Sequence, residues 1–394
     1  MQKPIRILSA DMDILGETEA YESMFFTRRF HTFGDNELQI NRYKKHADKL
    51  LKGNLILVGK DLNKVFIIKH REIGLDENGK ATENWIIRGL SLQSVVGQRI
   101  TIPPAYTAYD YKSGNAESVM KHYIERNIVN PVDPRRKIPQ LVIAPNQNRG
   151  PSISWQSRYK NLAEEMTEIS LATGLGWDVT LDLKNKQWVF DVVEGRDVSV
   201  NQSIHPPVIF SPQFESLQSL HYTESELNYK NSAYVAGQGE GVERRIVEVG
   251  KEVGLSRHEI FIDARDIPET EDIEVPDGEG GTTNETIPRP VADIIKDLTD
   301  RGNQQLAQLI QEHYLEGQIL THSPFKYEKD YNLGDITTIQ SKDWGVTLDT
   351  RITEIKEIYE ENGFRIEGTF GNNRPTLTQK IKQELAQMSG EVRK

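Results

Sequence analysis

Two acidic pairs are the first candidates for acid–base catalysis. Asp11 and Asp13 are two positions apart, and Glu164 and Glu165 are adjacent. A glycosidase needs two carboxylates that flank the scissile bond, one as acid and one as base or nucleophile. Adjacent acids in a chain with 59 acidic and 48 basic residues are more often a solvated face. We therefore predict no catalytic carboxylate pair.

Histidines and serines are the next candidates, for metal binding or nucleophilic catalysis. His258-Glu259 lacks the second histidine of a zinc-protease helix. The other residues weighed are scattered histidines, more often found at a surface or core edge, and serines outside a nucleophile-elbow context: His205, His221, His313 and His322, and Ser154, Ser211 and Ser232. We predict no catalytic and no metal-binding residue among them.

Two loops resemble ligand-binding loops in spacing alone. Gly237 to Gly241, with sequence GQGEG, resembles a phosphate loop, but such a loop leads from a strand into a helix and Arg245 to Val249 has the pattern of a strand. It predicts a flexible hairpin tip. Asp76 to Gly79 resembles the start of a calcium loop, but Ile87 stands at the twelfth position, where a bidentate glutamate is needed. This segment predicts a plain turn.

Aromatic and sulfur chemistry adds no site. The five tryptophans could form a sugar-binding platform, but buried strand aromatics are commoner: Trp85, Trp155, Trp177, Trp188 and Trp344. The absence of cysteine excludes disulfides, thiolate zinc sites and cysteine nucleophiles. We predict no cofactor.

Size and charge narrow the class of protein. The 394 residues are enough for about two to four domains, and the formal net charge is −11. Nucleic-acid binders are usually basic, and Pro134 to Lys137, the one dense basic cluster, reads as a solvated loop. The sequence contains no run of about 18 apolar residues, so we predict no membrane-spanning helix. The N-terminal segment lacks the apolar stretch of a signal peptide.

The elements that must position these residues begin with a strand-rich region. Short apolar runs separated by turns, from Pro4 to Leu90, predict a small β-barrel or β-sandwich over residues 1–102, which Pro103 and Pro104 end. Helical periodicity in 116–124 and 156–173, with Gly174 as a stop, is followed by alternation in 179–192. This pattern predicts an α+β domain over residues 103–206.

A second strand-rich region follows and is interrupted. Residues 207–265 and 318–371 predict a second strand-rich module, separated by an insertion over 266–317. We expect that insertion to be a long mobile acidic loop, 266–288, and a helix that follows Pro290 and ends at Gly317. Residues 372–394 predict a polar helical or frayed tail. The predicted fold is therefore α+β and strand-rich, with two strand-rich modules, an inserted α+β domain and a small helical insertion.

Several motifs carry a resemblance. Tyr331 to Ile336 (YNLGDI), Arg351 to Ile355 (RITEI) and Gly371 at the end of a β-run look like a pattern in tail proteins of long-tailed bacteriophages and prophages. Gly174 to Trp177, the strand Trp188 to Asp191, and Gly195-Arg196-Asp197 are similar to the same proteins. With the order of the modules, these motifs resemble the baseplate or tail-tip hub family, which includes the N-terminal part of tail-associated lysins and the hub of T-even phages.

The resemblance implies a structural role. It implies a homotrimer in which each copy contributes two small antiparallel β-barrels to a ring of six, joining a sixfold tail tube to a threefold tip. In this sequence the implied barrels are residues 1–102 and residues 207–265 with 318–371. The implied partners are other copies, the distal tail protein, the tail tube, the tape-measure protein and tip or fibre proteins, with no membrane and with DNA only as passing cargo. The implied location is the virion tail, assembled in the host cytoplasm.

Two alternatives stay open. Many members of this family continue into a peptidase, lysozyme or fibre domain, whereas this sequence stops at Lys394. The chain could instead be a tail-associated enzyme that degrades peptidoglycan or polysaccharide, for which two carboxylates in an aromatic-lined cleft would be the sign. It could also be a tail module that binds the host wall without turnover, which predicts saturable binding to wall polymers.

Overall fold

The N-terminal module, residues 2–102, is a group of seven strands. The computed structural model describes residues 2–75, 77, 79–80, 82–276 and 282–371 of the chain. The strands are β1 (Ile5–Leu8), β2 (Ile14–Thr18), β3 (Ser23–Arg29), β4 (Asp35–Asn41), β5 (Leu55–Val58), β6 (Val65–Glu72) and β7 (Asn84–Ser91), with short helical turns η1 (Ala47–Lys49) and η2 (Leu92–Gln98). In β4 the buried positions alternate with half-buried ones, as one covered face requires.

The middle module, residues 103–206, combines two helices with a three-stranded sheet and a two-stranded sheet. Its elements are β8 (Asp110–Asn115), α1 (Ala116–Ile124), η3 (Glu125–Val129), η4 (Pro134–Arg136), β9 (Leu141–Ile143), β10 (Ser152–Ser157), α2 (Leu162–Thr173), β11 (Gly176–Asp182) and β12 (Gln187–Val193). The strand orders of the two sheets are β11-β12-β9 and β10-β8. Asn161 caps α2 by accepting hydrogen bonds from two backbone N–H groups, and Gly174, at φ 72°, ends it as predicted.

All four residues of β5 are buried, which ties the first two modules together. Ile56 and Val58 pack inside the N-terminal module, while Leu55 and Leu57 pack in the core that contains α1 and α2. A strand covered on both faces reads as a continuous apolar run, here Leu-Ile-Leu-Val, and not as an alternation.

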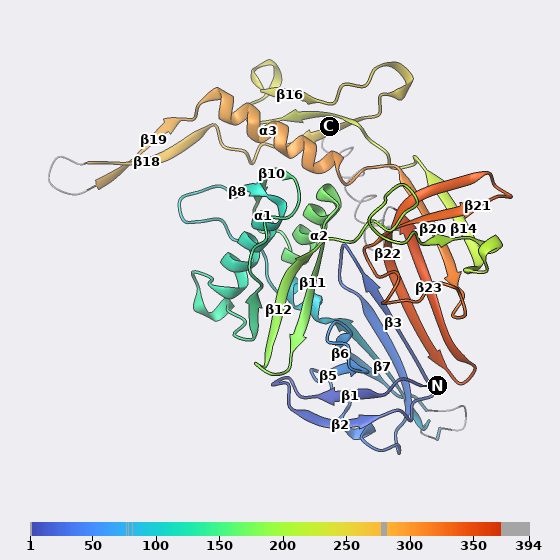
Figure 1. The fold of residues 1–394 in the computed structure, drawn as a ribbon. Coiled ribbons are helices and arrows are strands. Elements are labelled where there is room, and N and C mark those ends of the chain that lie inside the picture. The colour runs from blue at the N-terminus through green and yellow to red at the C-terminus, as the bar shows by residue number, and fades with distance from the viewer. Residues whose placement is uncertain (1, 76, 78, 81, 277–281, 372–394) are drawn as a thin grey trace.

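The C-terminal module, residues 207–225 and 312–371, supplies the remaining strands of the largest sheet. They are β13 (Ile209–Phe210), β14 (Leu217–Ser225), β20 (Glu312–Ile319), β21 (Ile336–Ser341), β22 (Val346–Glu360) and β23 (Gly363–Gly371), with a turn η5 (Pro212–Phe214). They join the N-terminal strands in one 13-stranded sheet, ordered β14-β20-β23-β22-β3-β4-β7-β6-β5-β1-β2, with β21 beside β22 and β13 beside β21 (Figure 1).

The strand-rich α+β class is thus confirmed. The pairings among the described residues do not close either group of strands into a ring, so two closed barrels stay a prediction. None of the helices described here is long and apolar enough to span a membrane.

The insertion, residues 226–311, is a separate α/β layer that lies along the top of Figure 1. Its elements are β15 (Ser232–Ala236), η6 (Gly241–Glu243), β16 (Ile246–Val249), η7 (Gly254–Ser256), β17 (Glu259–Asp263), β18 (Thr270–Pro276), β19 (Thr282–Pro288) and α3 (Val291–Leu306). The strands β15 to β17 pair with one another and pack on α3 through Val235 and Leu298. The structure therefore differs from the expectation that these strands belong to a second barrel.

Two expectations about the insertion were wrong. Much of the acidic segment 266–288 is not a loop, because β18 and β19 pair antiparallel from Thr270↔Pro288 to Pro276↔Thr282. The helix does not reach Gly317: α3 ends at Leu306, and Glu312–Ile319 is strand β20. Pairing of β20 with β14 on one side and β23 on the other overrides the helical spacing of its apolar residues.

Candidate functional site: a buried junction of three modules

The acidic pairs do not form a carboxylate pair in a cleft. Asp11 and Asp13 lie exposed in the turn between β1 and β2, where Asp13 contacts Lys186 at 2.5 Å. On α2, Glu164 is exposed while Glu165 is fully buried, since adjacent helical residues face different directions. The Trp155 indole N–H donates to Glu165. Burial raises the pKa of Glu165 to about 7, although Lys160 at 3.6 Å opposes the shift.

The histidines and serines are not brought together. His205, His221 and His322 are exposed, and His313 is hydrogen-bonded to Tyr222 at 2.8 Å. The three serines occupy separate elements: Ser154 in β10, Ser211 at the start of η5 and Ser232 in β15. Over the part of the chain that the structure describes, no three His, Asp or Glu residues are arranged to hold a metal ion.

The structure describes only one of the two ligand-like loops in full. Gly237 to Gly241 connect β15 to the antiparallel strand β16, so the predicted hairpin connection is confirmed. The calcium-like segment falls partly on residues 76 and 78, outside the described residues. Glu259 lies in strand β17, so His258-Glu259 is not on a helix.

The tryptophans do not form a platform. Four lie in separate strands, Trp85 in β7, Trp155 in β10, Trp177 in β11 and Trp188 in β12, and Trp344 lies in the turn between β21 and β22. Trp155 and Trp177 are buried core residues. That the chain has no catalytic, cofactor-binding or metal-binding residue stays a prediction.

The motifs singled out in the sequence converge instead around one ring, that of Phe30, just after β3. A Cβ at Gly176 would lie 2.4 Å from the Phe30 ring, and one at Gly334 would lie 2.3 Å from it. A Cβ at Gly195 would lie 1.7 Å from the carbonyl oxygen of Gly334. Only glycine permits such approach of two backbones and a ring. These positions come from three of the quoted motifs, and the junction they form is a meeting point of all three modules.

The backbone of Phe30 is hydrogen-bonded to both neighbouring modules. The Phe30 N–H donates to the Thr353 carbonyl at 2.9 Å, and the Trp177 N–H donates to the Phe30 carbonyl at 3.3 Å. The Arg351 guanidinium, from a fourth motif, lies over the Phe30 ring at 5.0 Å and donates to the Gly334 carbonyl. Phe30 thereby links the C-terminal module to the middle one.

A salt bridge closes the same junction between Arg196 and Asp335. The two side chains are 2.6 Å apart at Arg196 Nη2 and Asp335 Oδ2, and Asp335 is buried. Asp335 also accepts hydrogen bonds from the backbone N–H groups of Arg196 and Asn332, at 2.9 and 2.8 Å. The motifs at the junction therefore supply glycines that make room for Phe30, the ion pair Arg196–Asp335 and the Arg351 guanidinium.

His31, next to Phe30, is buried in the junction. Its ring contacts the Ser170 hydroxyl at 2.7 Å, and its carbonyl accepts the Trp177 indole N–H at 2.8 Å. Burial, helped by the charge of Arg351, lowers the pKa of His31 from 6.5 to about 3. His31 is neutral in the folded protein across the physiological range, so it works as a packing residue.

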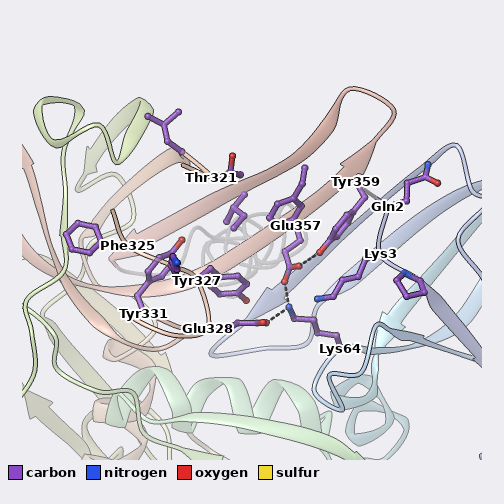
Figure 2. Close-up of a pocket in the computed structure, with 15 residues that line it drawn as sticks. Gln2, Lys3, Lys64, Thr321, Phe325, Tyr327, Glu328, Tyr331, Glu357 and Tyr359 are labelled. Atoms are coloured by element: carbon purple, nitrogen blue, oxygen red, sulfur yellow. Dashed lines mark hydrogen bonds and ion pairs between the residues drawn. The ribbon is translucent and has the colours of Figure 1, made fainter. Parts of the chain in front are cut away.

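A second buried cluster joins the N-terminal and C-terminal modules at Lys64. Its ammonium is fully buried, 2.5 Å from Glu357 on β22 and also paired with Glu328 (Figure 2). Burial alone would lower the pKa of Lys64, but Tyr327 and the two carboxylates outweigh it and raise the pKa above its ordinary value. Lys64 is therefore held protonated, which makes it a partner for acids and a poor nucleophile or base.

The cavity beside Lys64 is a gap between modules. It measures about 510 Å³, and its lining combines aromatic side chains, among them Tyr327, Tyr331 and Tyr359, with charged ones such as Lys3 (Figure 2). Its two carboxylates, from Glu328 and Glu357, are both committed to Lys64. The arrangement stabilises the seam between β3 and β22 and offers no acid–base pair.

The insertion meets the middle module through a different kind of contact. Tyr109 donates to Asp266, which also pairs with Arg301 of α3 at 3.2 Å. Lys296 of α3 donates to the Tyr111 hydroxyl at 2.5 Å, and Tyr111 is 45% exposed. We call these residues the insertion contact. It is polar and open to solvent, whereas the junction is buried.

Comparisons with known proteins agree with this architecture. A family model described as Siphovirus ReqiPepy6 Gp37-like protein matches residues 4–372. A comparison with curated proteins finds no match. Among solved structures, the 43 kDa tail protein of prophage MuSo2 from Shewanella oneidensis is similar, with a TM-score of 0.53 at 11% identity over 94% of this chain and 98% of that one.

A tail protein from Neisseria meningitidis MC58 is similar to the same degree, with a TM-score of 0.53 at 12% identity over 94% of this chain and 96% of that one. At this identity the likeness concerns the fold. The family model covers nearly the whole chain, including every motif that meets at the junction. The protein therefore belongs to the Siphovirus ReqiPepy6 Gp37-like family and has the fold of prophage tail proteins, as the resemblance in its motifs predicted.

Proposed function

We propose that this chain is a structural subunit of a phage or prophage tail, the hub of the baseplate or tail tip. Three copies form a ring of six strand-rich lobes, two from each chain, that joins a sixfold tail tube to a threefold tip. Its partners are other copies of itself, the distal tail protein, the tail tube, the tape-measure protein and the tip or fibre proteins. It resides in the virion tail after assembly in the host cytoplasm.

One observation carries the proposal: the N-terminal and C-terminal modules are fused into a single sheet. Strand β3 of one pairs with β22 of the other over six residue pairs, from Arg29↔Glu354 to Met24↔Tyr359. Glu357, which binds the buried Lys64, is one of the paired residues, and the ladder continues to Phe30, whose N–H donates to the Thr353 carbonyl. A hub needs two lobes held at a fixed angle, and a continuous hydrogen-bonded sheet with a dry junction provides that rigidity.

The charge of the chain is compatible with a channel for DNA. A net charge of −11 repels nucleic acid, so DNA that passes through a ring of such subunits would slide and not adhere. This part of the proposal predicts that the surface facing the ring axis is negative or neutral. A positively lined axis would contradict it.

The proposal is tested first by the number of copies in solution. Mass photometry of the purified full chain over a range of concentrations should show trimers, because a permanent ring interface buries more than about 2,000 Å². A chain that stays monomeric at every concentration, and is also present as a single copy in isolated tails, contradicts the hub.

The enzyme and wall-binding alternatives are separated by two assays. Incubation with bacterial cell walls should cause no loss of turbidity and no saturable binding to wall polymers. Turbidity loss abolished by one Glu→Gln substitution would establish the enzyme, and saturable binding without turnover would establish the wall-binding module.

A further inference from the structure

The largest sheet ends in two strands that have a partner on one side only. Strand β14, at one end of the order, pairs with β20, and strand β2, at the other end, pairs with β1. For both strands, the pairings found among the described residues leave the outer backbone edge open. Figure 1 shows β14 at the right of the molecule and β2 at the bottom.

The edge of β14 lacks the features that keep edge strands from pairing. It is nine residues long, LQSLHYTES, with no lysine and no proline, and Glu224 is its only acidic residue. Its one irregularity lies at its beginning, between Leu217 and Ser219, so Leu220 to Ser225 form a regular strand. Soluble proteins usually protect such an edge by charge, proline, bulges or a covering loop, since an open edge recruits another strand.

The chain itself already joins two modules by strand pairing. The seam between β3 and β22 holds the N-terminal module of this chain against its own C-terminal module. In a ring where the two kinds of module alternate, every second boundary lies between copies. The strands available there are the opposite edges of the same two modules, β14 and β2.

We propose that β14 of one copy pairs with β2 of the next, so that the sheets of successive copies run on into one another around the ring. This inference rests on the proposed hub and names its interface. The contact is head-to-tail, with different surfaces from the two copies, which is the kind that closes into rings. Strand β2 has five residues, so it covers at most five of the nine in β14.

Cysteine cross-linking tests this pairing cleanly because the chain has no cysteine of its own. Glu17 of β2 and His221 of β14 are both exposed and are replaced, Glu17→Cys and His221→Cys, in one full-length chain. A flexible bismaleimide reports proximity without requiring disulfide geometry. We expect the double variant to give covalent dimers and trimers, and each single variant to give neither.

Two controls test whether the covalent dimers and trimers come from the β14–β2 contact. An equal mixture of the two single variants should give dimers but no covalent trimers, because each mixed ring can form one link. Replacing His221→Cys by Lys69→Cys, an exposed position on the interior strand β6, should abolish the trimer band.

The outcomes separate the inference from the function beneath it. Trimers seen by mass photometry without cross-linking of the double variant overturn the β14–β2 contact and leave the hub standing. Cross-linking of a single variant to itself indicates a symmetric contact and also overturns the inference. The absence of trimers and cross-links in solution, together with a single copy of the chain in isolated tails, overturns the inference and the proposed hub together.

Discussion

The junction and the insertion contact join modules of the same chain in opposite ways. At the junction, the residues that meet are glycines, a buried ring and the ion pair Arg196–Asp335, next to the strand pairing between β3 and β22. At the insertion contact, half-buried Tyr109 donates to Asp266, and exposed Tyr111 accepts a hydrogen bond from Lys296. The ion pair Arg301–Asp266 lies within the insertion, with the Arg301 guanidinium over the Tyr109 ring. Both contacts contain charges, so the number of ion pairs does not distinguish them.

What distinguishes them is the cost of separation. A buried charge that loses its partner is left uncompensated in a low-dielectric site, whereas an exposed one is solvated again by water. We therefore infer that the two strand-rich modules move as one body and that the insertion is the part free to shift. Variants at the two contacts should therefore differ in how much stability they lose.

The largest effect is expected from Gly195→Ala. The added Cβ would lie 1.7 Å from the Gly334 carbonyl oxygen, and two backbones would have to separate to admit it. We expect a loss of more than about 4 kcal/mol in the free energy of unfolding, seen as loss of soluble protein or a large drop in melting temperature. Gly74→Ala is the matched control, since its Cβ would meet open space. Equal stability of the two variants would contradict a close-packed junction.

The next effect is expected from Lys64→Met. It leaves Glu357 buried without its cation, which should destabilise the protein by about 3–5 kcal/mol in urea unfolding. The double variant Lys64→Met, Glu357→Leu should recover much of that loss. Lys69→Met, at an exposed position of the following strand, should change stability by less than about 0.5 kcal/mol. No recovery in the double variant would show that the charge pair is not the cause.

Two buried groups, Glu165 in the middle module and His31 at the junction, should make stability depend on pH in opposite directions. In the middle module, the folded pKa of Glu165 is about 7 against an ordinary 4.5, so the folded state keeps a proton that the unfolded state loses. That contribution to stability is complete below pH 4.5 and is lost as the pH rises to 7. At the junction, the folded pKa of His31 is about 3 against 6.5, so its contribution is lost as the pH falls below 6.5.

Glu165→Gln separates these two opposing contributions. The variant keeps the neutral shape of the side chain, so it should gain about 1–3 kcal/mol relative to the wild type between pH 5 and pH 8. Its stability should then rise with pH from 5 to 6.5, because His31 remains. Urea unfolding at pH 5 and pH 6.5 measures this. The same change in the free energy of unfolding with pH in variant and wild type would contradict it.

The smallest effect is expected from Arg301→Ala at the insertion contact. Its partner Asp266 is 45% exposed at the side chain, so we expect a loss of less than about 1 kcal/mol in global stability. Hydrogen exchange in α3 and β15 to β17 should nevertheless become faster, while exchange in β3 and β22 stays unchanged. Arg265→Ala, at a neighbouring exposed arginine 3.9 Å from Asp263, is the control. Faster exchange at β3 would contradict the separation of the two regions.

Much of the fold followed from local patterns. The strand runs and the stop of α2 at Gly174 depend on near neighbours in the chain, and they were predicted. The start of α2 was predicted too early, since the helix begins at Leu162 after the strand Ser152–Ser157 and not at residue 156. The end of α3 was not, because β20 becomes a strand only through pairing with β14 and β23, which lie far away in the sequence. The β18–β19 hairpin was missed because acids and threonines hide the alternation of Ile273 and Val275.

The junction was visible in the sequence only as separate motifs. Gly176, Gly195, Gly334 and Arg351 all stood in segments that carried the resemblance. Phe30, the ring that they enclose, had no signal beyond an aromatic β-prone run. Nor could spacing indicate that positions so far apart in the chain meet, since this depends on the β3–β22 pairing.

The most direct test of the hub is a cryo-electron microscopy reconstruction of the assembled full-length protein or of the tails that contain it. We predict three copies around the axis, with N-terminal and C-terminal modules alternating as six lobes and the insertions outside the ring. A reconstruction in which the copies touch only through their insertions, or in which a single copy sits on the tail, would contradict the account.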